Sequence, residues 1–580
     1  MGSRQIVRNL PRAQRGVALL AMLVVIVTGA SWMMMSALNA GSNRTALNRH
    51  DNARILAEAK HALVGWMITE AIEAGENNPG RLPCPEAAAN IGTANEGIAA
   101  GNCTLPAVGR LPWRTLGLPK LLDAAGEPLW YVVSPGWALP TAVSLLTINS
   151  NTLGQLTLDG AANATIALVV APGPALSVQA SGSCTARAQA HNALAPDYRD
   201  YLECENAANP VDALFVTRGP TDSFNDQVLT VTTRDVLPGL EAAIMKRIER
   251  EIVPALKSVY GVGFSVPAAT PVYPYAAPFV DPETATYKGV AGTTEGLLPF
   301  NKVTSCVEGA DRCLSTSLIT WLPPSPALSP VADDILTPGA AHINTSGGGQ
   351  DCEWEDADVA YCEGEVHQHG SATDPGMIIR MSATFANVVM GLRTLDPTRV
   401  QVSVRDLSTE AWVPVATSPT ATATLNAADG SATVTVNGQL PNTYAVAGDD
   451  RVYYQIRLER QIIADHALLD ENDATTGWFV RNEWYRLLYY AVAQGQTAAN
   501  LTSLPCAGAN CLSVTSGGVQ QDNKRALFLL AGRGQRNQTR PSAVLTDFLE
   551  TTENTNLDTL FEHPRIDASV NDRIIIVDQN

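Results

Sequence analysis

The longest uninterrupted apolar run of the chain lies near its N-terminus. Residues 17–27, VALLAMLVVIV, are all apolar, and no charged residue occurs between Arg15 and Arg44. Residues 17–38, folded as a helix, would span about 33 Å, which is enough to cross the roughly 30 Å hydrocarbon core of a bilayer. This pattern predicts a transmembrane helix.

The helical pattern continues beyond this run. Apolar residues recur at spacings of three and four, the period of one helix face: Leu56, Ala59, Leu63, Trp66, Met67 and Ala71. We therefore expect one helix over residues 17–75. A secretory signal peptide is the alternative, but its apolar core is usually shorter and it does not need such a continuation.

The residues before the apolar run carry only positive charge. Residues 1–16 contain Arg4, Arg8, Arg12 and Arg15 and no acidic residue. By the positive-inside rule this end stays in the cytoplasm, and everything after residue 38 is exported.

Short apolar runs bounded by Gly, Pro or Asn-Asp predict strands in the rest of the chain, and they recur in one order. The first series comprises residues 129–133, 166–173, 200–206, 215 and 224–229. The second series comprises residues 488–492, 526–532, 547–554, 561 and 570–575. The last blocks of the two series lie 346 residues apart. This order predicts a duplicated β-unit, or an insertion that splits two related halves.

The segments between the two series differ in character. Residues 231–257 have one apolar stripe and predict an amphipathic helix. Residues 261–375 are rich in Pro, Gly and Thr, which is typical of long loops. Alternating residues within 382–460 predict an inserted β-sandwich, which is where we expect ligand recognition. Exposed Trp321, Trp354 or Trp412 could stack on sugars, although a tryptophan beside strands more often belongs to the core.

The ten cysteines form five couples that are close in sequence. Local pairing predicts five disulfides, which form in an oxidising compartment: Cys84 with Cys103, Cys184 with Cys204, Cys306 with Cys313, Cys352 with Cys362, and Cys506 with Cys511. A zinc site that joins Cys352 and Cys362 to His367 and His369 is a poorer alternative, because the chain has no CxxC.

Composition and motifs exclude several function classes. The chain has 580 residues and is 46% hydrophobic, which is ample for packed cores and argues against disorder. With 57 acidic and 39 basic residues, its net charge of −18 argues against a nucleic-acid partner. We find no GxSxG, HExxH or phosphate-binding motif, so we expect no enzyme.

Acidic residues in the repeated blocks suggest one cofactor. Asn225-Asp226 and Asn571-Asp572, with Glu203, Glu205, Glu550 or Glu553, offer oxygen ligands of the kind calcium prefers. We favour structural turns, because the dense Asp-x-Asp pattern of a calcium loop is missing. Asp470, Asn472 and Asp473 alternate in that way but lack the closing glutamate, so we expect no cofactor, with calcium as the alternative.

The N-terminal motif resembles the type IV pilin and pseudopilin superfamily. That family has a basic leader ending in glycine, a cut before an apolar helix, and a globular head. The resemblance implies that prepilin peptidase cleaves after Gly16 and that Val17 becomes the methylated first residue. Most pilins carry glutamate at the fifth mature position, which is Ala21 here. K-type minor pseudopilins and some minor pilins share this departure, which suits the leading end of a filament because no subunit ahead needs to pair with that charge.

The resemblance implies an α+β fold. A long N-terminal transmembrane helix would lead into a pilin-like β-sheet head, with a duplicated pilin-like β-unit and a β-sandwich insertion. The expected domains are a leader, an assembly helix, a first head, a disulfide-stapled loop segment, a sandwich and a second β-unit, at residues 1–16, 17–75, 76–260, 261–380, 381–461 and 462–580.

The implied function is that of a minor, tip-proximal subunit of a type IV pilus or a type II secretion pseudopilus. The expected location is the inner membrane, with a periplasmic head, and then the filament tip. Its partners would be other pilins, prepilin peptidase, the inner membrane and an extracellular surface ligand. A tip adhesin with a lectin-like module and a membrane-anchored periplasmic hydrolase are the alternatives.

Overall fold

The computed structural model describes most of the chain, in segments separated by short gaps. The described residues are 13–138, 147–177, 188–203, 206–207, 214–265, 272–284, 287–301, 315–322, 351–355, 358–367, 377–406, 408–426, 430–440, 451–497, 506, 510–556, 558–567 and 569–579. They form two compact units. The first comprises Met1–Trp66, Leu82–Thr141 and Leu153–Thr233, and the second comprises Met67–Arg81, Ala142–Thr152 and Arg234–Asn580.

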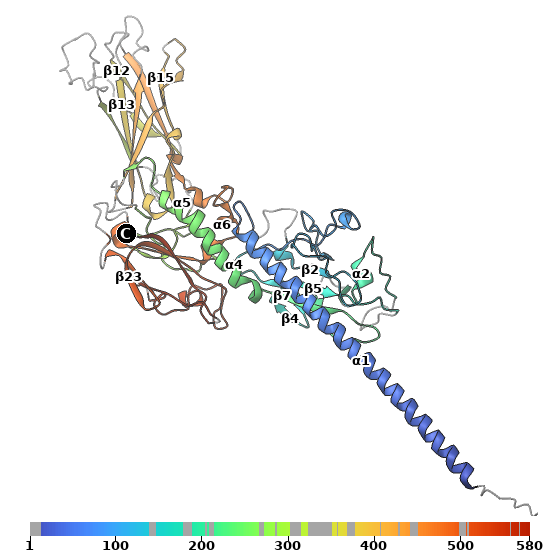
Figure 1. Ribbon diagram of the computed structural model, residues 1–580. Helices are drawn as coiled ribbons and strands as arrows, with labels where there is room; N and C mark the ends of the chain where they lie inside the picture. The colour runs from blue at the N-terminus through green and yellow to red at the C-terminus, as the bar shows by residue number, and fades with distance from the viewer. Residues whose placement is uncertain are drawn as a thin grey trace, which may run out of the picture. The chain divides into compact units, whose positions relative to one another are not determined.

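The first unit combines the helix α1 (Ala13–Ile72), most of which lies in this unit, with an antiparallel sheet (Figure 1). The sheet has the order β1-β2-β5-β3-β4, with β7 also paired to β5 and β6 paired to β3. Its strands are β1 (Ala107–Arg110), β2 (Trp130–Val133), β3 (Gly154–Leu158), β4 (Ala161–Asn163), β5 (Thr165–Ala171), β6 (Leu214–Phe215) and β7 (Gln227–Thr232). All seven residues of β5 are buried, so this apolar strand is the centre of the unit.

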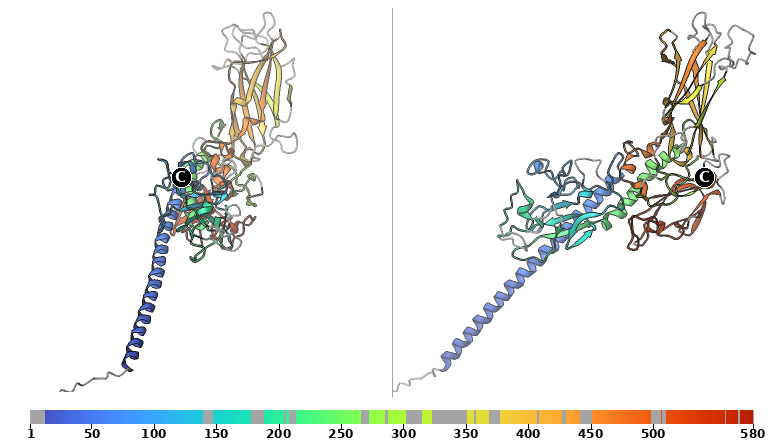
Figure 2. Two further views of the ribbon diagram at one scale, coloured as in Figure 1. Left: turned by 90° about the vertical axis from the view of Figure 1, so that its right-hand side faces the viewer. Right: turned by 180° about the vertical axis from the view of Figure 1, so that it is seen from behind.

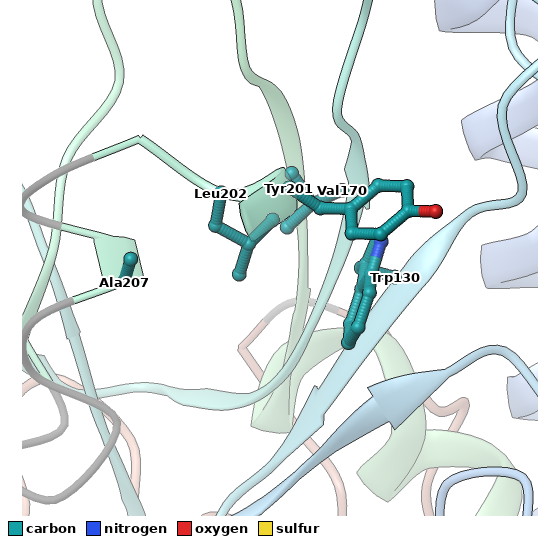
Figure 3. Close-up of a cluster of buried hydrophobic side chains, with 5 residues drawn as sticks. All are labelled: Trp130, Val170, Tyr201, Leu202 and Ala207. Atoms are coloured by element: carbon teal, nitrogen blue, oxygen red, sulfur yellow. The ribbon is translucent and has the colours of Figure 1, made fainter. Parts of the chain in front are cut away.

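Part of the first core lies between the sheet and the short helix α2 (Tyr198–Tyr201). Figure 3 shows Trp130 of β2 beside Tyr201, with the two ring centroids 5.1 Å apart. Val170, Leu202 and Ala207 complete this cluster. Asp197 begins α2 by accepting a hydrogen bond from the Arg199 amide, as helix-capping residues do.

The second unit repeats this arrangement. Its helical part comprises α4 (Thr233–Arg247), the π-helical turn η4 (Ile248–Ile252) and α5 (Val253–Ser258). Its sheet has the order β9-β21-β23-β22-β24, and β25 pairs with β23. The strands are β9 (Glu295–Leu297), β21 (Leu488–Val492), β22 (Leu512–Ser516), β23 (Val519–Leu530), β24 (Leu560–His563) and β25 (Arg573–Gln579).

The two sheets share their register as well as their order. Trp130 faces Val170 in the first sheet, as Tyr489 faces Leu529 in the second. Each sheet also contains one parallel pair, β3 with β6 and β22 with β24. The repeated sequence blocks therefore occupy equivalent positions in two copies of one unit.

The copies differ most in the connection between their first two strands. In the first unit residues 111–129 join β1 to β2, whereas in the second unit residues 298–487 join β9 to β21. The longer connection contains a β-sandwich.

The sandwich consists of two five-stranded sheets. One has the order β10-β13-β18-β17-β8, and the other has the order β11-β12-β19-β15-β16. Its strands are β8 (Phe264–Ser265), β10 (Ser315–Leu322), β11 (Asp351–Trp354), β12 (Val359–His367), β13 (Met377–Phe385), β15 (Val400–Arg405), β16 (Trp412–Pro414), β17 (Thr420–Leu425), β18 (Ala432–Leu440) and β19 (Arg451–Glu459). Burial alternates along β18, as expected for strands with one face in a core.

Short elements complete the second unit and the loops. The strands β14 (Arg393–Leu395) and β20 (Ile463–Asp465) form a separate pair, and α6 (Gly477–Arg481) is a short helix. The 3-10 turns are η1 (Ala88–Asn90), η2 (Pro135–Trp137), η5 (Val388–Met390), η6 (Pro397–Arg399), η8 (Arg460–Ile462), η9 (Ala467–Leu469), η10 (Trp484–Leu487), η11 (Gln494–Gln496) and η14 (Leu545–Asp547).

The predicted transmembrane segment is corrected by the structure. Among the described residues, no helix combines the length and the apolar character that crossing a bilayer requires. The prediction counted residues 17–38, but the unbroken apolar run ends at Val27 and covers only about 17 Å of helix. Thr28, Gly29 and Ser31 follow it directly. The long N-terminal transmembrane helix of the predicted fold, and the inner-membrane location derived from it, are therefore wrong.

Candidate functional site

The first candidate site is the early part of α1, in which the side chains of residues 27–28, 30–34 and 46–47 are exposed. Large apolar side chains are among them: Trp32 is 72% exposed, Met33 and Met34 are each 68% exposed, and Leu47 is 63% exposed. Figure 2 shows α1 as one continuous helix that extends beyond the strands of its unit. Exposed apolar surface of this size is typical of a site that another molecule covers.

The directions of these side chains indicate what kind of partner could cover them. Successive residues of an α-helix point about 100° apart, so Trp32, Met33 and Met34 together cover more than half of the circumference. Apolar side chains that point in such different directions need contacts on more than one side of the helix. The exposed segment therefore fits a bundle of helices better than a single flat surface.

The later part of α1 is held on its own unit. Leu56, Ala59 and Leu63 form a buried stripe. The Gln227 side chain donates to the Arg49 carbonyl (3.1 Å), and Asn52 accepts from the Ala124 amide (2.7 Å). One helix thus has a docked part and a part whose apolar surface has no cover in the described chain.

The predicted processing residues lie near the start of this helix. Gly16 and Val17 are both within α1, which begins at Ala13. Ala21 is also within α1, so the position that holds a glutamate in most pilins is helical here.

The second candidate site is a pair of buried carboxyl groups that we call the first clasp, Glu203 and Asp226. The Glu203 amide donates to Asp226 Oδ2 (3.0 Å), and the Asp226 amide donates to Glu203 Oε2 (2.7 Å). Gln189 Nε2 donates to Glu203 Oε1 (3.1 Å), and Asn206 Nδ2 donates to Asp226 Oδ2 (2.9 Å). Protein N–H groups therefore take up three of the four carboxyl oxygens, and Asp226 Oδ1 has no donor among the described residues.

The same arrangement occurs in the second unit as the second clasp, Glu550 and Asp572. The Glu550 amide donates to Asp572 Oδ2 (2.8 Å), and the Asn571 amide donates to Glu550 Oε2 (3.0 Å). Gln538 Nε2 donates to Glu550 Oε1 (3.1 Å). Each clasp joins the segment that contains its glutamate to the start of the last strand of its unit, which is β7 in the first unit and β25 in the second.

The asparagine before each clasp aspartate closes a turn. Asn225 Nδ2 donates to the Pro174 carbonyl (2.7 Å), and Asn571 Nδ2 donates to the Arg533 carbonyl (2.8 Å). A Cβ atom on Gly173 would lie 2.8 Å from the Asn225 side chain, and one on Gly532 would lie 2.5 Å from that of Asn571. Glycine is needed at both places because the asparagine approaches so closely.

The electrostatics of the clasps favour a proton over a metal ion. Burial and the facing carboxyl group raise the pKa of Asp226 and of Asp572 well above the ordinary range, and burial raises the pKa of Glu203. Among the described residues, no group of three or more His, Cys, Asp or Glu side chains is placed to hold a metal ion. Glu205 lies outside the described residues, and Glu553 accepts from Asn556 (3.4 Å).

The alternating acidic run at residues 470–473 forms turns. Asp470 Oδ1 accepts from the Asn472 amide (2.9 Å), and Asp473 Oδ1 accepts from the amides of Thr475 (2.9 Å) and Thr476 (2.7 Å). These bonds lead the chain into α6, which starts at Gly477.

Five of the ten cysteines are seen to be disulfide-bonded in the part of the chain that the structure describes. Disulfides join Cys84 to Cys103 and Cys506 to Cys511. Both pairings were predicted from closeness in sequence, and both are confirmed. Cys362 is disulfide-bonded, and Cys352 lies opposite it in the β11–β12 register. Cys184, Cys204, Cys306 and Cys313 lie outside the described residues.

The remaining sequence candidates are not brought together into a site. Trp412 is half-buried on β16, and the backbones of Trp321 and Trp354 lie on β10 and β11. His367 ends β12, whereas His369 lies outside the described residues.

A small pocket in the first unit has no counterpart in the sequence-based candidates. It is lined by Glu86, Arg110, Trp113 and Lys120 among other residues. Glu96 balances its cations, because its carboxylate lies 2.7 Å from Lys120 Nζ and 3.9 Å from Arg110. Burial raises the pKa of Glu86, which accepts from the Gly97 amide (2.6 Å). Glu96 thus offsets the positive charge of both cations that line the pocket.

Comparisons of the chain with protein-family models, with curated proteins and with solved structures found no match in any of the three.

Proposed function

We propose that this chain is a minor pilin-like subunit that joins a filament of the type IV pilus or type II secretion class near its tip, where it helps to start or cap the filament. One observation carries the proposal. A 60-residue helix at the N-terminus is docked on an antiparallel sheet through its later part and exposes Trp32, Met33 and Met34 in its earlier part.

The physical argument is the burial of this exposed segment. Each large apolar side chain that leaves water contributes about 1.5–3 kcal/mol. A filament whose subunits pack their N-terminal helices together would cover the segment on all sides, which a single partner helix would not. The partners would be other minor and major pilins.

Ala21 supports a place at the leading end. A glutamate at this position would need an amine from a subunit ahead of it, because a buried charge is unfavourable without a partner. Alanine has no such requirement, so the chain can be the first subunit of a filament.

Photo-crosslinking in the cells that make the protein tests the proposal. A photoreactive residue at Met33 should capture pilin-like subunits, because this position faces the helices of its neighbours. The matched control is His61, an exposed position on the docked part of the same helix. Capture from His61 but not from Met33 would contradict the proposal.

The mature N-terminus gives a second, independent test. The resemblance to pilins predicts cleavage by prepilin peptidase after Gly16, so mass spectrometry should find a methylated Val17 as the first residue. An intact Met1, or a start near Ala40, would count against membership of this class.

A further inference from the structure

The two clasps share the bond from the glutamate amide to the aspartate and the bond from the glutamine to the glutamate. They differ in the amide that bonds the glutamate, which belongs to Asp226 in the first clasp and to Asn571 in the second, and in one neighbouring side chain. The residue two positions after the clasp glutamine is His191 in the first unit and Arg540 in the second. Each lies over the aromatic ring that stands two positions before the clasp glutamate. The rings of His191 and Tyr201 stack 4.1 Å apart, and the Arg540 guanidinium lies 4.7 Å from the ring of Phe548. The duplication therefore provides a natural comparison of one clasp with and without a fixed cation.

In both clasps one aspartate oxygen has no N–H donor. Asp226 Oδ1 and Asp572 Oδ1 are buried, and no hydrogen-bond donor of the described chain reaches them. The other carboxylate oxygens of the first clasp already accept from amides. A proton on Asp226 Oδ1, donated to the Glu203 carboxylate, would give this last oxygen of the first clasp a hydrogen bond. Without that proton two negative charges would face each other away from water, which is strongly unfavourable.

The neighbours decide how firmly each clasp keeps its proton. In the first clasp the facing side chains are Gln189 and Asn206, which are neutral. His191 is paired with Glu127 (3.0 Å), and Asp123 accepts from the Gly173 amide (2.7 Å), so the charged groups nearby are already engaged. Among the residues that the structure describes, no cation is a main influence on the charge of Glu203 or Asp226.

In the second clasp Arg540 is that cation. Its positive charge acts on both Glu550 and Asp572, and it also acts on Glu241 and Asp547. Its guanidinium donates to the carbonyls of Gly532 (2.7 Å) and Phe548 (3.1 Å), which holds it in place. Arginine stays charged across the accessible pH range, so it favours the ionised form of this clasp, although burial and the facing Glu550 still hold the pKa of Asp572 well above its ordinary range.

We propose that the first clasp is a pH-sensitive latch on β7, which loosens as the pH rises and the shared proton is lost, and that Arg540 makes the second clasp less sensitive to pH over the same range. The sign follows from linkage. The folded first unit holds a proton that the unfolded chain releases near the ordinary carboxyl range, so raising the pH above that range favours the open form.

Hydrogen exchange measured by mass spectrometry on the full chain tests this latch. After correction for intrinsic exchange rates, protection of β7 should fall about tenfold or more between pH 6 and pH 9, and the part of the fall in β25 that depends on Asp572 should be smaller. Glu295, whose pKa burial raises to about 8, also titrates in the second unit. Each variant is therefore compared with its parent strand by strand.

Three substitutions separate the latch from simple structural damage. Asp226→Asn replaces the protonated acid by an amide that can donate to Glu203, so it should remove most of the pH dependence of β7. Asp572→Asn is the matched control and should change β25 less. Glu203→Gln should weaken β7 at every pH, because its amide would face the N–H of either Gln189 or Asp226.

The outcomes are distinct. A flat β7 profile in Asp226→Asn with a sloped parent supports the latch. Equal slopes for β7 in the parent and in Asp226→Asn would overturn it. A loss of slope in β25 on Asp572→Asn that is as large as the loss in β7 on Asp226→Asn would also overturn it. Unchanged protection in Glu203→Gln would also overturn it, because the bonds described here leave no place for that amide.

Discussion

The two copies of the duplicated unit share a sheet order, a register and a clasp, but they keep different surroundings for them. The first copy has Arg110 and Val108 on the edge strand β1, where the second has Leu297 and Glu295 on β9. Conversely, the second copy has a cation, Arg540, where the first has His191. The bonds that both copies retain define the scaffold, and the side chains that differ show where each copy is specialised.

The largest effect is expected in the helix of the second unit, which contains a buried ion pair. Glu251 accepts from Arg247 Nε (2.8 Å) and from Trp478 Nε1 (2.7 Å). Glu251→Ala leaves Arg247 buried and unpaired, so it should destabilise the second unit by about 3–5 kcal/mol. Hydrogen-exchange protection of β21 and β23 measures this loss. Glu249→Ala, an exposed neighbour on the same turn, should change it by less than about 0.5 kcal/mol.

A matched pair of core substitutions tests whether the two copies of the duplicated unit unfold independently of each other. Leu168 and Leu527 occupy equivalent, fully buried positions on β5 and β23. Each change to alanine should cost about 2–5 kcal/mol, because it leaves a cavity. Hydrogen exchange should show the loss in the unit that carries the substitution. If Leu168→Ala lowers protection of β23 as much as that of β5, the units are not independent.

A smaller, pH-dependent effect is expected at Glu295. Burial is the main cause that raises its pKa to about 8, with the nearby Asp558 as a second cause. The folded form therefore binds a proton that the unfolded form has lost, so stability falls as the pH rises from the ordinary glutamate range to pH 8. Glu295→Gln should remove up to about 1.4 kcal/mol of this loss per pH unit. Chemical denaturation between pH 5 and pH 9 provides the test, and parallel pH profiles for parent and variant would refute it.

The smallest effect is expected at the two clasp glutamines. Gln189→Ala and Gln538→Ala each remove a donor to the clasp glutamate, which should cost about 1 kcal/mol. Hydrogen exchange of β7 and β25 reports each loss. Each amide also donates to a backbone carbonyl, that of Tyr201 (3.0 Å) for Gln189 and that of Thr546 (3.1 Å) for Gln538. We expect the larger loss for Gln189, because it is buried whereas Gln538 is half-buried. A larger loss for Gln538 would contradict this order.

The sequence contains good signals for the strands of both sheets. Apolar runs such as residues 166–171 and 526–530 are bounded by turn residues, and their common order reflects the common topology. The first strand of each sheet is harder to recognise. β1 and β9 are short, and Arg110 and Leu297 share no chemistry, because only the backbone pairing with the next strand is retained.

The candidate sites were visible only in part. Glu203 and Asp226 stand out as polar residues within apolar blocks, but oxygen-rich residues alone do not distinguish a metal site from a shared proton. That distinction depends on which backbone amides reach the oxygens, and residues 23 positions apart in sequence do not reveal it. The membrane prediction failed because it extended an apolar run of 11 residues across the polar positions that follow it.

The long connection in the second unit leaves and re-enters its sheet at neighbouring points. Leu297, the last residue of β9, faces Tyr489 near the start of β21, so the ends of the insertion lie as close together as those of a hairpin. A short loop such as the one over residues 111–129 could therefore replace the whole sandwich without altering the order of the strands. Evolution can exchange a module attached in this way, or lengthen it, while the unit that carries it keeps its own core.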